Sequence, residues 1–303
     1  MSTAANGSIE MTEHVLPGAP RKRGASKKIW KLIGLVAPGV ILLTVGLLWP
    51  FATMLHLSFL DQFPGDASYT LRNYTQFATD AYFLGIALRT FALAIIVTVL
   101  TAVIGYPVAW FLARSESRWK HLVFLAVVSP LLVSIVVRTI GWTILLGNEG
   151  LLNAFLVATG IVDQPLRLMQ SFWTVVAGMT HVLLPFMILS IASVLGKIDK
   201  SVLEAAAVLG ATPVRNFIRV VLPLSIQGVA SGSVIVFCLC IGAYITPIWL
   251  GRGHVTVMSI AIYEQMVVMV DWPLGSAASM ILTLVTLAVL LIYGLAIRRH
   301  AKR

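Results

Sequence analysis

Six long stretches of the chain contain no charged residue, and this pattern constrains the fold more than any other feature. The stretches are 32–60, 90–113, 121–137, 168–196, 220–251 and 272–297. A helix needs about 20 apolar residues to cross about 30 Å of hydrocarbon. Five stretches exceed that length, and the third, with 17 residues, just suffices. The pattern therefore predicts an all-α polytopic membrane protein with six transmembrane helices.

The composition agrees with a chain that lies mostly in lipid. Hydrophobic residues make up 58% of the 303 residues and charged residues 11%. A soluble domain carries about 25% charged residues, because its surface faces water. A membrane β-barrel would show segments of about ten residues with alternating polarity, whereas residues 93–100 are apolar on every side. These features argue against a soluble enzyme, a nucleic-acid-binding protein and a secreted protein.

Positive charges are divided unevenly between the two sides that six crossings define. One side holds the N-terminal tail 1–31, the loops 114–120 and 197–219, and the C-terminal tail 298–303, with 17 of the 22 Lys and Arg residues. Lys and Arg are retained in the cytoplasm, so we expect both termini to be cytoplasmic. The basic tails then face lipid headgroups rather than nucleic acid. The first stretch is too long for a cleaved signal peptide and is expected to stay as an anchor.

Short elements are also predicted between and within the crossings. We expect the outer segment 61–89 to end in a short interfacial helix, and the outer segment 138–167 to contain a re-entrant or interfacial helix from Leu151 to Ala158. Cys238 and Cys240 lie two residues apart on a helix and therefore point to different faces, and both are expected to be core residues. The small residues of Gly228-x-x-x-Gly232 would let two helices approach closely.

The cytoplasmic segment 197–223 carries the strongest local signals. Asp199 is a candidate N-cap, and apolar residues then recur at a spacing of three to four positions. Gly210 suits the left-handed residue that ends a helix, and Thr212-Pro213 is typical of a second helix start. Two short helices joined by a tight turn are therefore predicted. The apolar stripe on the first helix comprises Val202, Ala205, Ala206 and Leu209.

Three interpretations of this segment are possible. A solvated connector does not explain a small-residue stripe beside two caps and a turn glycine. A DNA-reading helix-turn-helix has a similar outline, but basic residues are few and two crossings tether the segment. A docking element for a cytoplasmic protein, which uses a helix in a groove, is favoured.

The same segment resembles the EAA motif of permease subunits of ABC importers. The match comprises Glu204-Ala205-Ala206, Gly210 six positions after the glutamate, and Val220-x-Leu222-Pro223, where Val220 stands in place of the usual Ile. Wider similarity over about 30–297 points to the spermidine/putrescine type of permease. It is carried by Arg138-Thr-Ile-Gly-Trp142, Leu146-Gly147, Asn153, Leu184-Pro185-Phe186, Gly242-Ala-Tyr-Ile-Thr-Pro247, Leu250-Gly251 and Trp272-Pro-Leu-Gly275. Asp271 replaces the Asn that often precedes the last of these stretches.

The resemblance implies one part of a larger importer in a bacterial inner membrane. Its expected partners are two copies of an ATPase subunit, a second and related permease, and a periplasmic solute-binding protein. Residues 199–221 would form the coupling helices on the ATPase, with Glu204, Ala205, Ala206, Gly210, Pro213 and Pro223 as coupling residues. The chain has no Gly-x-x-x-x-Gly-Lys-Ser/Thr phosphate loop. We therefore expect a non-catalytic subunit without a cofactor or a metal, with ATP and Mg²⁺ on the partner.

An ion-coupled secondary transporter is the rival class. Such proteins usually place Asp, Glu or His inside the membrane as proton or ion relays. The six stretches contain no Asp or Glu, and their histidines are His56, His121 and His181. The absence of carboxylates favours an external energy source.

Candidate residues along the passage can be chosen by the chemistry that would bind a solute. An ammonium group is bound by carboxylates and by aromatic faces, and the matching candidates are Tyr106, Trp142, Tyr244, Tyr263 and Glu264. Arg138 either reaches the outer headgroups, braces the loop that follows or faces the passage. His181 either lines a cavity or is a core residue. Arg138 and His181 would suit an anionic or zwitterionic solute, such as an opine or a phosphonate, and the polyamine remains an expectation from the resemblance.

Overall fold

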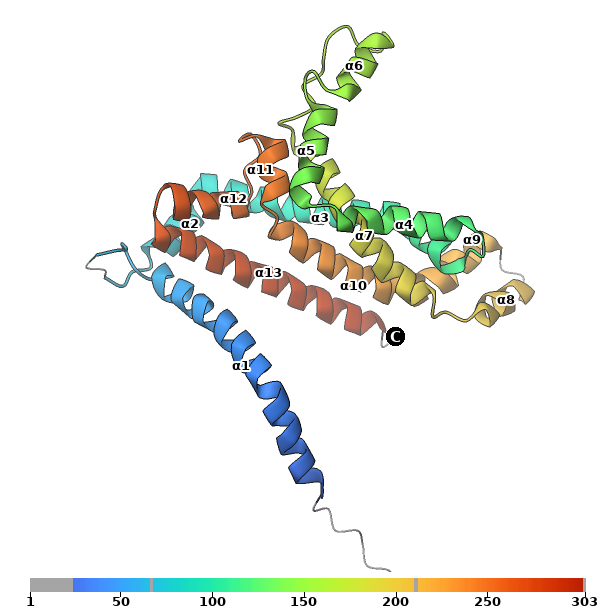
Figure 1. The fold of residues 1–303 in the computed structure, drawn as a ribbon, viewed down its shortest axis with the longest axis horizontal. Coiled ribbons are helices and arrows are strands. Elements are labelled where there is room, and N and C mark those ends of the chain that lie inside the picture. The colour runs from blue at the N-terminus through green and yellow to red at the C-terminus, as the bar shows by residue number, and fades with distance from the viewer. Residues whose placement is uncertain (1–23, 66–67, 210–211, 302–303) are drawn as a thin grey trace, which may run out of the picture. The chain divides into compact units, whose positions relative to one another are not determined.

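The computed structural model describes residues 24–65, 68–209 and 212–301, which form helices and one isolated β-bridge between Leu60 and Tyr69 (Figure 1). The all-α prediction is confirmed. The helices are α1 (Gly24–Ser58), α2 (Arg72–Thr79), α3 (Ala81–Arg114), α4 (Trp119–Leu132), α5 (Ile135–Leu146), α6 (Leu151–Ala158), α7 (Phe172–Leu195), α8 (Lys200–Val208), α9 (Pro213–Asn216), the π-helix η1 (Phe217–Val221), α10 (Leu222–Ile241), α11 (Ile245–Gly251), α12 (Met258–Tyr263), the π-helix η2 (Glu264–Val268) and α13 (Trp272–Ala301).

Six of the described helical segments are long and apolar enough to cross a membrane. They are Val36–Ser58, Ala81–Arg114, Ile135–Ala158, Phe172–Leu195, Pro213–Ile241 and Trp272–Ile297. The number of candidate crossings therefore equals the number predicted from the charge-free stretches.

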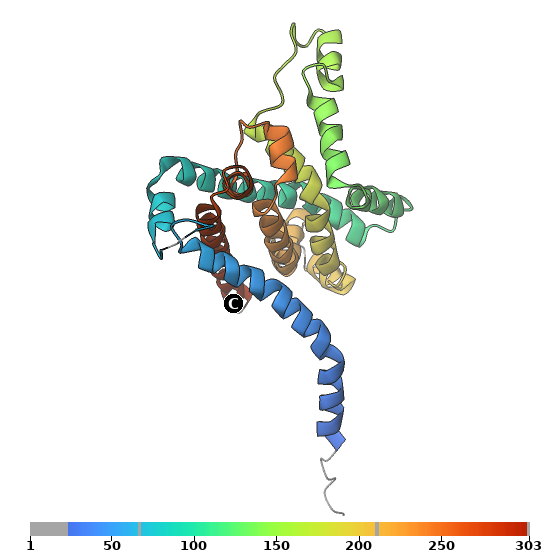
Figure 2. The ribbon, with the colours of Figure 1, turned by 60° about the vertical axis from the view of Figure 1, so that its left-hand side comes forward.

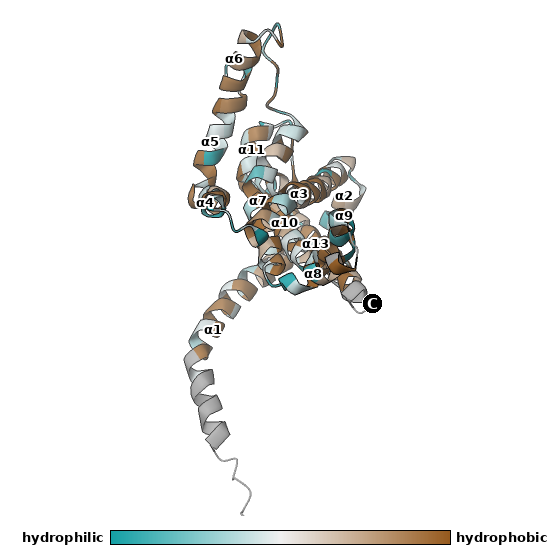
Figure 3. Cartoon of the chain, turned by 90° about the vertical axis from the view of Figure 1, so that its right-hand side faces the viewer, coloured by the Kyte–Doolittle hydropathy of each residue, from teal (hydrophilic) through white to brown (hydrophobic). Residues whose placement is uncertain are grey.

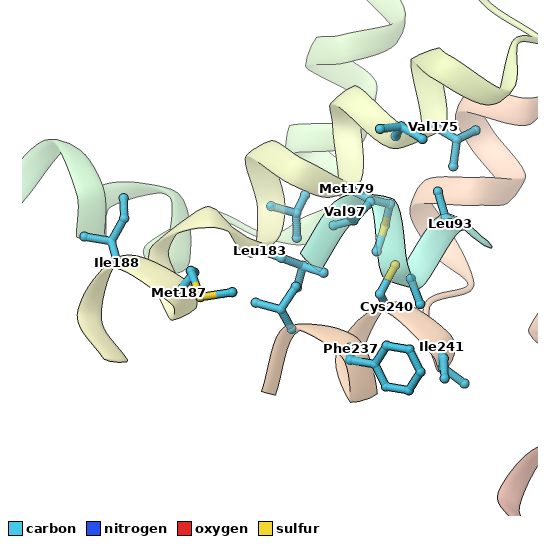
Figure 4. Packing of buried hydrophobic residues seen from close by; sticks show 14 of the residues in the cluster. Leu93, Val97, Val175, Met179, Leu183, Met187, Ile188, Phe237, Cys240 and Ile241 are labelled. Atoms are coloured by element: carbon cyan, nitrogen blue, oxygen red, sulfur yellow. The ribbon is translucent and has the colours of Figure 1, made fainter. Parts of the chain in front are cut away.

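The hydrophobic core lies where α3, α7 and α10 pack against one another. Figure 4 shows buried side chains of all three helices in one cluster. Gly232 of α10 faces α7 so closely that a Cβ atom there would lie 2.6 Å from Sδ of Met187. A Cβ atom at Gly228 would lie 3.1 Å from Cα of Ile191. The predicted close approach at these two glycines is therefore confirmed.

A second, smaller apolar cluster joins α13 to α2, α3 and α12. Figure 2 shows α2 (cyan) and α13 (dark red) near one end of α3 (teal). Its buried residues are Phe77, Phe83, Ile86, Met258, Ala261, Leu274 and Ala278. Cys240 is buried and Cys238 is exposed, so the two point to different faces as predicted, and the expectation of a core position is wrong for Cys238.

The chain forms two compact units, Met1–Thr53 and Met54–Arg303. In the first unit, α1 leaves its apolar side chains uncovered, and Leu42, Leu43 and Trp49 are each about three quarters exposed. A continuous apolar surface of this kind requires cover by lipid or by protein. The predicted tail 1–31 falls partly outside the described residues, and its last eight residues belong to α1.

The second membrane helix begins earlier than predicted. The charge-free stretch was 90–113, whereas α3 starts nine residues before it, because the Asp80 carboxylate caps the helix by accepting from the amide of Tyr82 at 2.8 Å. Arg89 interrupts the apolar stretch without ending the helix, and its guanidinium donates to the carbonyl of Thr256 at 3.4 Å. The charge of Arg89 therefore ends the charge-free stretch of the sequence but does not end the helix.

The third predicted stretch, 121–137, is not one helix. The chain becomes extended at Val133, which separates α4 from α5. The 14 residues of α4 span about 21 Å, and the longer apolar segment 135–158 is itself interrupted between α5 and α6. Arg138 explains why the break is tolerated, since its Nη2 donates to the carbonyl of Val133 at 2.8 Å.

The fifth predicted stretch, 220–251, is also interrupted, since α10 ends at Gly242 and α11 begins after Tyr244. The break frees a backbone carbonyl, and the hydroxyl of Ser259 donates to the carbonyl of Ala243 at 2.5 Å. A side chain from a different part of the sequence therefore supplies the hydrogen bond that this carbonyl lacks within the helix.

Short helices occur in both segments that were predicted to be outer. α6 has the predicted bounds Leu151–Ala158, whereas α2 lies in the middle of 61–89, which ends inside α3 rather than in a short helix. The Asn153 side chain fixes the loop around α6. Its Nδ2 donates to the carbonyls of Gly147 and Leu166 at 3.0 and 2.9 Å, and its Oδ1 accepts from the amide of Leu166 at 2.9 Å.

Candidate functional site

The segment 199–221, hereafter the hairpin segment, begins with the predicted cap. Oδ1 of Asp199 accepts from the amide of Ser201 at 3.0 Å. This hydrogen bond lowers the pKa of Asp199 below its ordinary value, so the cap remains ionised at neutral pH. The carboxylate thereby satisfies one of the free N–H groups at the start of α8.

The second half of the hairpin segment also starts as predicted. Oγ1 of Thr212 accepts from the amide of Arg215 at 3.3 Å, and Pro213 occupies the first turn of α9. Nδ2 of Asn216 donates to the carbonyl of Leu203 at 3.1 Å, which ties the second helix to α8. Gly210, the predicted turn glycine, lies outside the described residues. Figure 3 shows hydrophilic residues in α8 and α9, beside the hydrophobic helices of the core.

Large aliphatic side chains of the hairpin segment stand open. Val208 and Leu209 are each 87% exposed, and Val214 is 68% exposed. The predicted stripe faces outward for the most part, with Ala206 half-buried, whereas Leu203 packs against the core. Glu204, Ala205, Pro213 and Pro223 are exposed as well. The predicted coupling residues that the structure describes therefore lie on or beside an uncovered surface.

Aromatic contacts connect the hairpin segment to α3. The ring of Phe217 meets Tyr106 and Trp110 edge to face, with centroids 5.4 and 6.1 Å apart. The guanidinium of Arg114 lies 5.7 Å from the centroid of Trp110. Lys200 and Glu116 form an ion pair between α8 and the loop that follows α3. The sequence favoured an interfacial position for Trp110 over a place along the passage, and no signal in it singled out Arg114 or Phe217.

Tyr106 therefore occupies a different place from the other predicted passage residues. Its hydroxyl is 2.6 Å from Oγ of Ser225 on α10. Together with the contact to Phe217, this hydrogen bond puts Tyr106 at the base of the hairpin segment.

Three other predicted passage residues form one group. Nε1 of Trp142 donates to Nδ1 of His181 at 3.3 Å, and the two rings stand edge to face with centroids 5.6 Å apart. Arg138 lies one turn before Trp142 on α5, so these two residues share a face of that helix. The Arg138 side chain braces the α4–α5 break that precedes it, whereas the bracing alternative predicted a contact with the loop that follows. This group presents a cation and two N-heterocyclic rings.

The last three predicted residues form a second group. Tyr244 precedes α11 and Tyr263 ends α12, and their rings lie 5.0 Å apart at a tilt of 41°. Glu264 is the next residue and is half-buried. Two phenol rings beside a carboxylate offer an ammonium group both charge pairing and a π surface. Among the described residues, no group of three or more His, Cys, Asp or Glu side chains could hold a metal ion.

Comparisons with known proteins identify the class of this protein. Residues 105–303 match the family described as the binding-protein-dependent transport system inner membrane component. The chain belongs to this family and is a permease subunit of an ABC importer, a multi-pass protein of the inner membrane. This assignment decides against the secondary-transporter class.

The relatives refine this placement. The chain is 34% identical over 235 residues to the spermidine/putrescine transport system permease protein PotB of Escherichia coli (strain K12), covering 78% of this chain and 85% of that protein. It is 34% identical over 212 residues to the inner membrane ABC transporter permease protein YdcU of the same organism, covering 65% and 66%. In fold it is similar to a bacterial alginate ABC transporter in complex with an alginate pentasaccharide-bound periplasmic protein. That match has a TM-score of 0.79 at 19% identity and covers 92% of this chain and 98% of the other.

Proposed function

We propose that this chain forms the translocation path for a polyamine such as putrescine or spermidine. The relatives named as spermidine/putrescine permeases support this substrate. The group formed by Tyr244, Tyr263 and Glu264 supplies the chemistry, since it combines aromatic faces with a carboxylate.

The hairpin segment is proposed to couple this path to a separate ATPase. The observation that carries the proposal is the exposure of Val208 and Leu209, 87% each, in a segment whose two helix starts are capped. Adjacent large aliphatic side chains left open on a capped helical hairpin are typical of a surface that another protein covers. The contacts of Phe217 with Tyr106 and Trp110 would carry movement of the hairpin segment to α3.

The proposed assembly contains two copies of the ATPase, which bind ATP and Mg²⁺, a second and related permease, and a periplasmic solute-binding protein. The family description includes dependence on a binding protein. Both termini and the hairpin segment are proposed to be cytoplasmic, because the basic residues concentrate on that side. Counting α4 or 135–158 as the third crossing gives the same orientation.

Purification of the tagged chain from its own host tests the assembly. We expect an ATPase subunit, a second permease and a solute-binding protein to accompany it. Glu204→Lys or Gly210→Val should leave membrane insertion intact and uncouple ATP hydrolysis from uptake in proteoliposomes. Normal coupled uptake by both variants would contradict the proposed coupling role.

Limited proteolysis tests the orientation. In right-side-out vesicles, trypsin added outside should not cut at Arg215, and in inverted vesicles it should. The reverse pattern would place the hairpin segment on the outer side and refute the proposed topology.

A small anionic or zwitterionic solute is the second candidate substrate. It is favoured by the group of Arg138, Trp142 and His181, which presents a cation and ring nitrogens. Uptake of labelled putrescine discriminates the two. For a polyamine, Glu264→Gln should lower uptake about tenfold or more, and Arg138→Gln should have the smaller effect. Absence of putrescine uptake by the wild type, together with uptake of a labelled opine or phosphonate that Arg138→Gln lowers more than Glu264→Gln does, would favour the second candidate.

A further inference from the structure

A polar pocket of about 250 Å³ lies where three loops meet at the start of α7. It is lined by Asn148, Arg167, Met169, Gln170 and Arg252, and is called the arginine pocket below. Asn148 follows α5, Gln170 precedes α7 and Arg252 follows α11, so tertiary packing assembles the pocket. Met169 is buried and the other four residues are exposed. The arginine pocket therefore opens to the surface through its polar side chains.

The backbone of the arginine pocket is strained. Among the described residues, three non-glycine residues have positive φ angles, and two of them, Gln170 at 66° and Arg252 at 43°, line this pocket. Hydrogen bonds hold both in place: the amide of Gln170 donates to the carbonyl of Leu250 at 3.0 Å, and the amide of Arg252 donates to that of Ile248 at 3.2 Å. Left-handed backbone at non-glycine residues persists where the surroundings impose it, and such residues gather at ligand-binding sites.

The charge of the arginine pocket is one-sided. Two guanidinium groups and two amide side chains line it, and no carboxylate does. Glu149, the acid nearest in sequence to Asn148, is not among the lining residues. Within the described part of the chain, the ion pair found is Lys200 with Glu116, so neither Arg167 nor Arg252 has an acidic partner there. Guanidinium groups bind carboxylates through paired, charge-assisted hydrogen bonds.

The location of the arginine pocket indicates which partner meets it. It lies at the first residue of α7, and the hairpin segment follows the last. The 24 residues of α7 span about 36 Å, so the two features are at opposite ends of the bundle. If the hairpin segment is cytoplasmic, the arginine pocket faces the periplasm. A phospholipid would need an apolar wall for its acyl chains, and Met169 is the one apolar residue of the lining.

We propose that the arginine pocket binds the carboxylate of an acidic side chain on the periplasmic solute-binding protein when that protein docks. The proposal rests on the proposed function, because it uses the orientation and the partner given there. It assigns to Arg167 and Arg252 a role in recognition of the binding protein, separate from the solute path. A polyamine is a cation and is repelled by two arginines. The arginine pocket is therefore not a binding site for the polyamine.

The test uses the complete assembly in phosphatidylcholine nanodiscs and the solute-binding protein that copurifies with it. Arg252→Gly removes the guanidinium and suits the left-handed backbone, and Arg167→Ala removes the other. We expect each to weaken binding of the solute-binding protein about tenfold, with the double variant weaker still. Arg72→Ala, which removes an exposed positive charge from α2, is the matched control and should bind normally.

Two further measurements give every outcome a meaning. A charge swap, with an acidic residue of the solute-binding protein changed to Lys against Arg167→Glu, should restore binding and would identify the carboxylate. Unchanged affinity in the double variant would overturn the proposal. So would loss of the second permease from the assembly, direct loss of solute affinity, or an effect seen only with phosphatidylglycerol present. Copurification of the ATPase and basal ATP hydrolysis should stay normal in all variants. If the wild type fails those two controls, the proposed function fails instead.

Discussion

Small residues serve opposite purposes at the α7–α10 interface and in the hairpin segment. At the interface, Gly228 and Gly232 bring two helices of the same chain together, and a Cβ atom at either position would crowd α7. In the hairpin segment, Ala205 is exposed and Ala206 is half-buried. The same kind of residue is covered in one region and open in the other. Under the proposed function, the covered region is complete within this chain and the open region is a surface for a second protein.

The largest expected effect comes from breaking the covered region. Gly232→Leu places a side chain where Cβ alone would lie 2.6 Å from Sδ of Met187. Overpacking of this degree should cost about 3 kcal/mol or more, measured as a lower thermal midpoint and yield in detergent. Gly294→Leu in α13 is the matched control, because nothing lies within 4 Å of its Cβ position. Equal losses in both variants would refute the packing role.

A second experiment removes the open apolar surface. Val208→Asp with Leu209→Asp should leave the thermal midpoint unchanged, since both side chains are 87% exposed. Burial of each against a partner is worth about 1.5 to 3 kcal/mol, so binding of the ATPase should weaken about a hundredfold or more. Ser117→Asp adds an acid to the neighbouring loop and should not weaken it. Retention of the ATPase by the double variant would mean that this surface is not the docking surface.

A smaller effect is expected from the N-cap of α9, which follows α8 in the hairpin segment. Thr212→Ala removes the hydroxyl that accepts from the amide of Arg215, a change that usually costs about 1 kcal/mol. The cost should appear as faster hydrogen exchange in α9 and a several-fold loss of ATPase affinity, with the core unaffected. Thr212→Ser keeps the cap and should behave as the wild type.

The smallest effect is expected at the Lys200–Glu116 pair. The hydrogen bond from Lys200, and then its charge, lower the pKa of Glu116 below its ordinary value. A carboxyl whose folded pKa is depressed stabilises above its ordinary pKa, and the contribution is lost as pH falls through the lower value. ATPase affinity should therefore be flat from pH 8 to about 6. Glu116→Gln should change it little, because the pair is exposed. A marked loss of ATPase affinity in Glu116→Gln at pH 7 would show that the ion pair positions α8.

Local signals in the sequence were sufficient for the elements that depend on neighbours along the chain. The caps at Asp199 and Thr212 and the bounds of α6 were predicted, because caps and turn residues act within one helical turn. The apolar stretches fixed the number of candidate crossings for a similar reason, since hydropathy is a property of each segment by itself.

Breaks and side-chain groups could not be predicted in this way. The α4–α5 break depends on Arg138 reaching Val133, and the end of α10 depends on Ser259, which comes from a later helix. A stretch without charges reports hydropathy and carries no information on such hydrogen bonds. Of the seven predicted passage residues, three formed one group and three another, while Tyr106 was placed by its contact with Ser225. The arginine pocket was missed because its lining residues come from three separate loops.

The bare aliphatic pair Val208 and Leu209 has a consequence for the life of the protein in the cell. If a separate subunit buries these two side chains, permease that is synthesised in excess of this subunit leaves them exposed to the cytosol. Chaperones and proteases continually triage such unassembled chains. Abundance of this permease would then follow the supply of its partner, so deletion of the partner gene should shorten its half-life without touching its own expression.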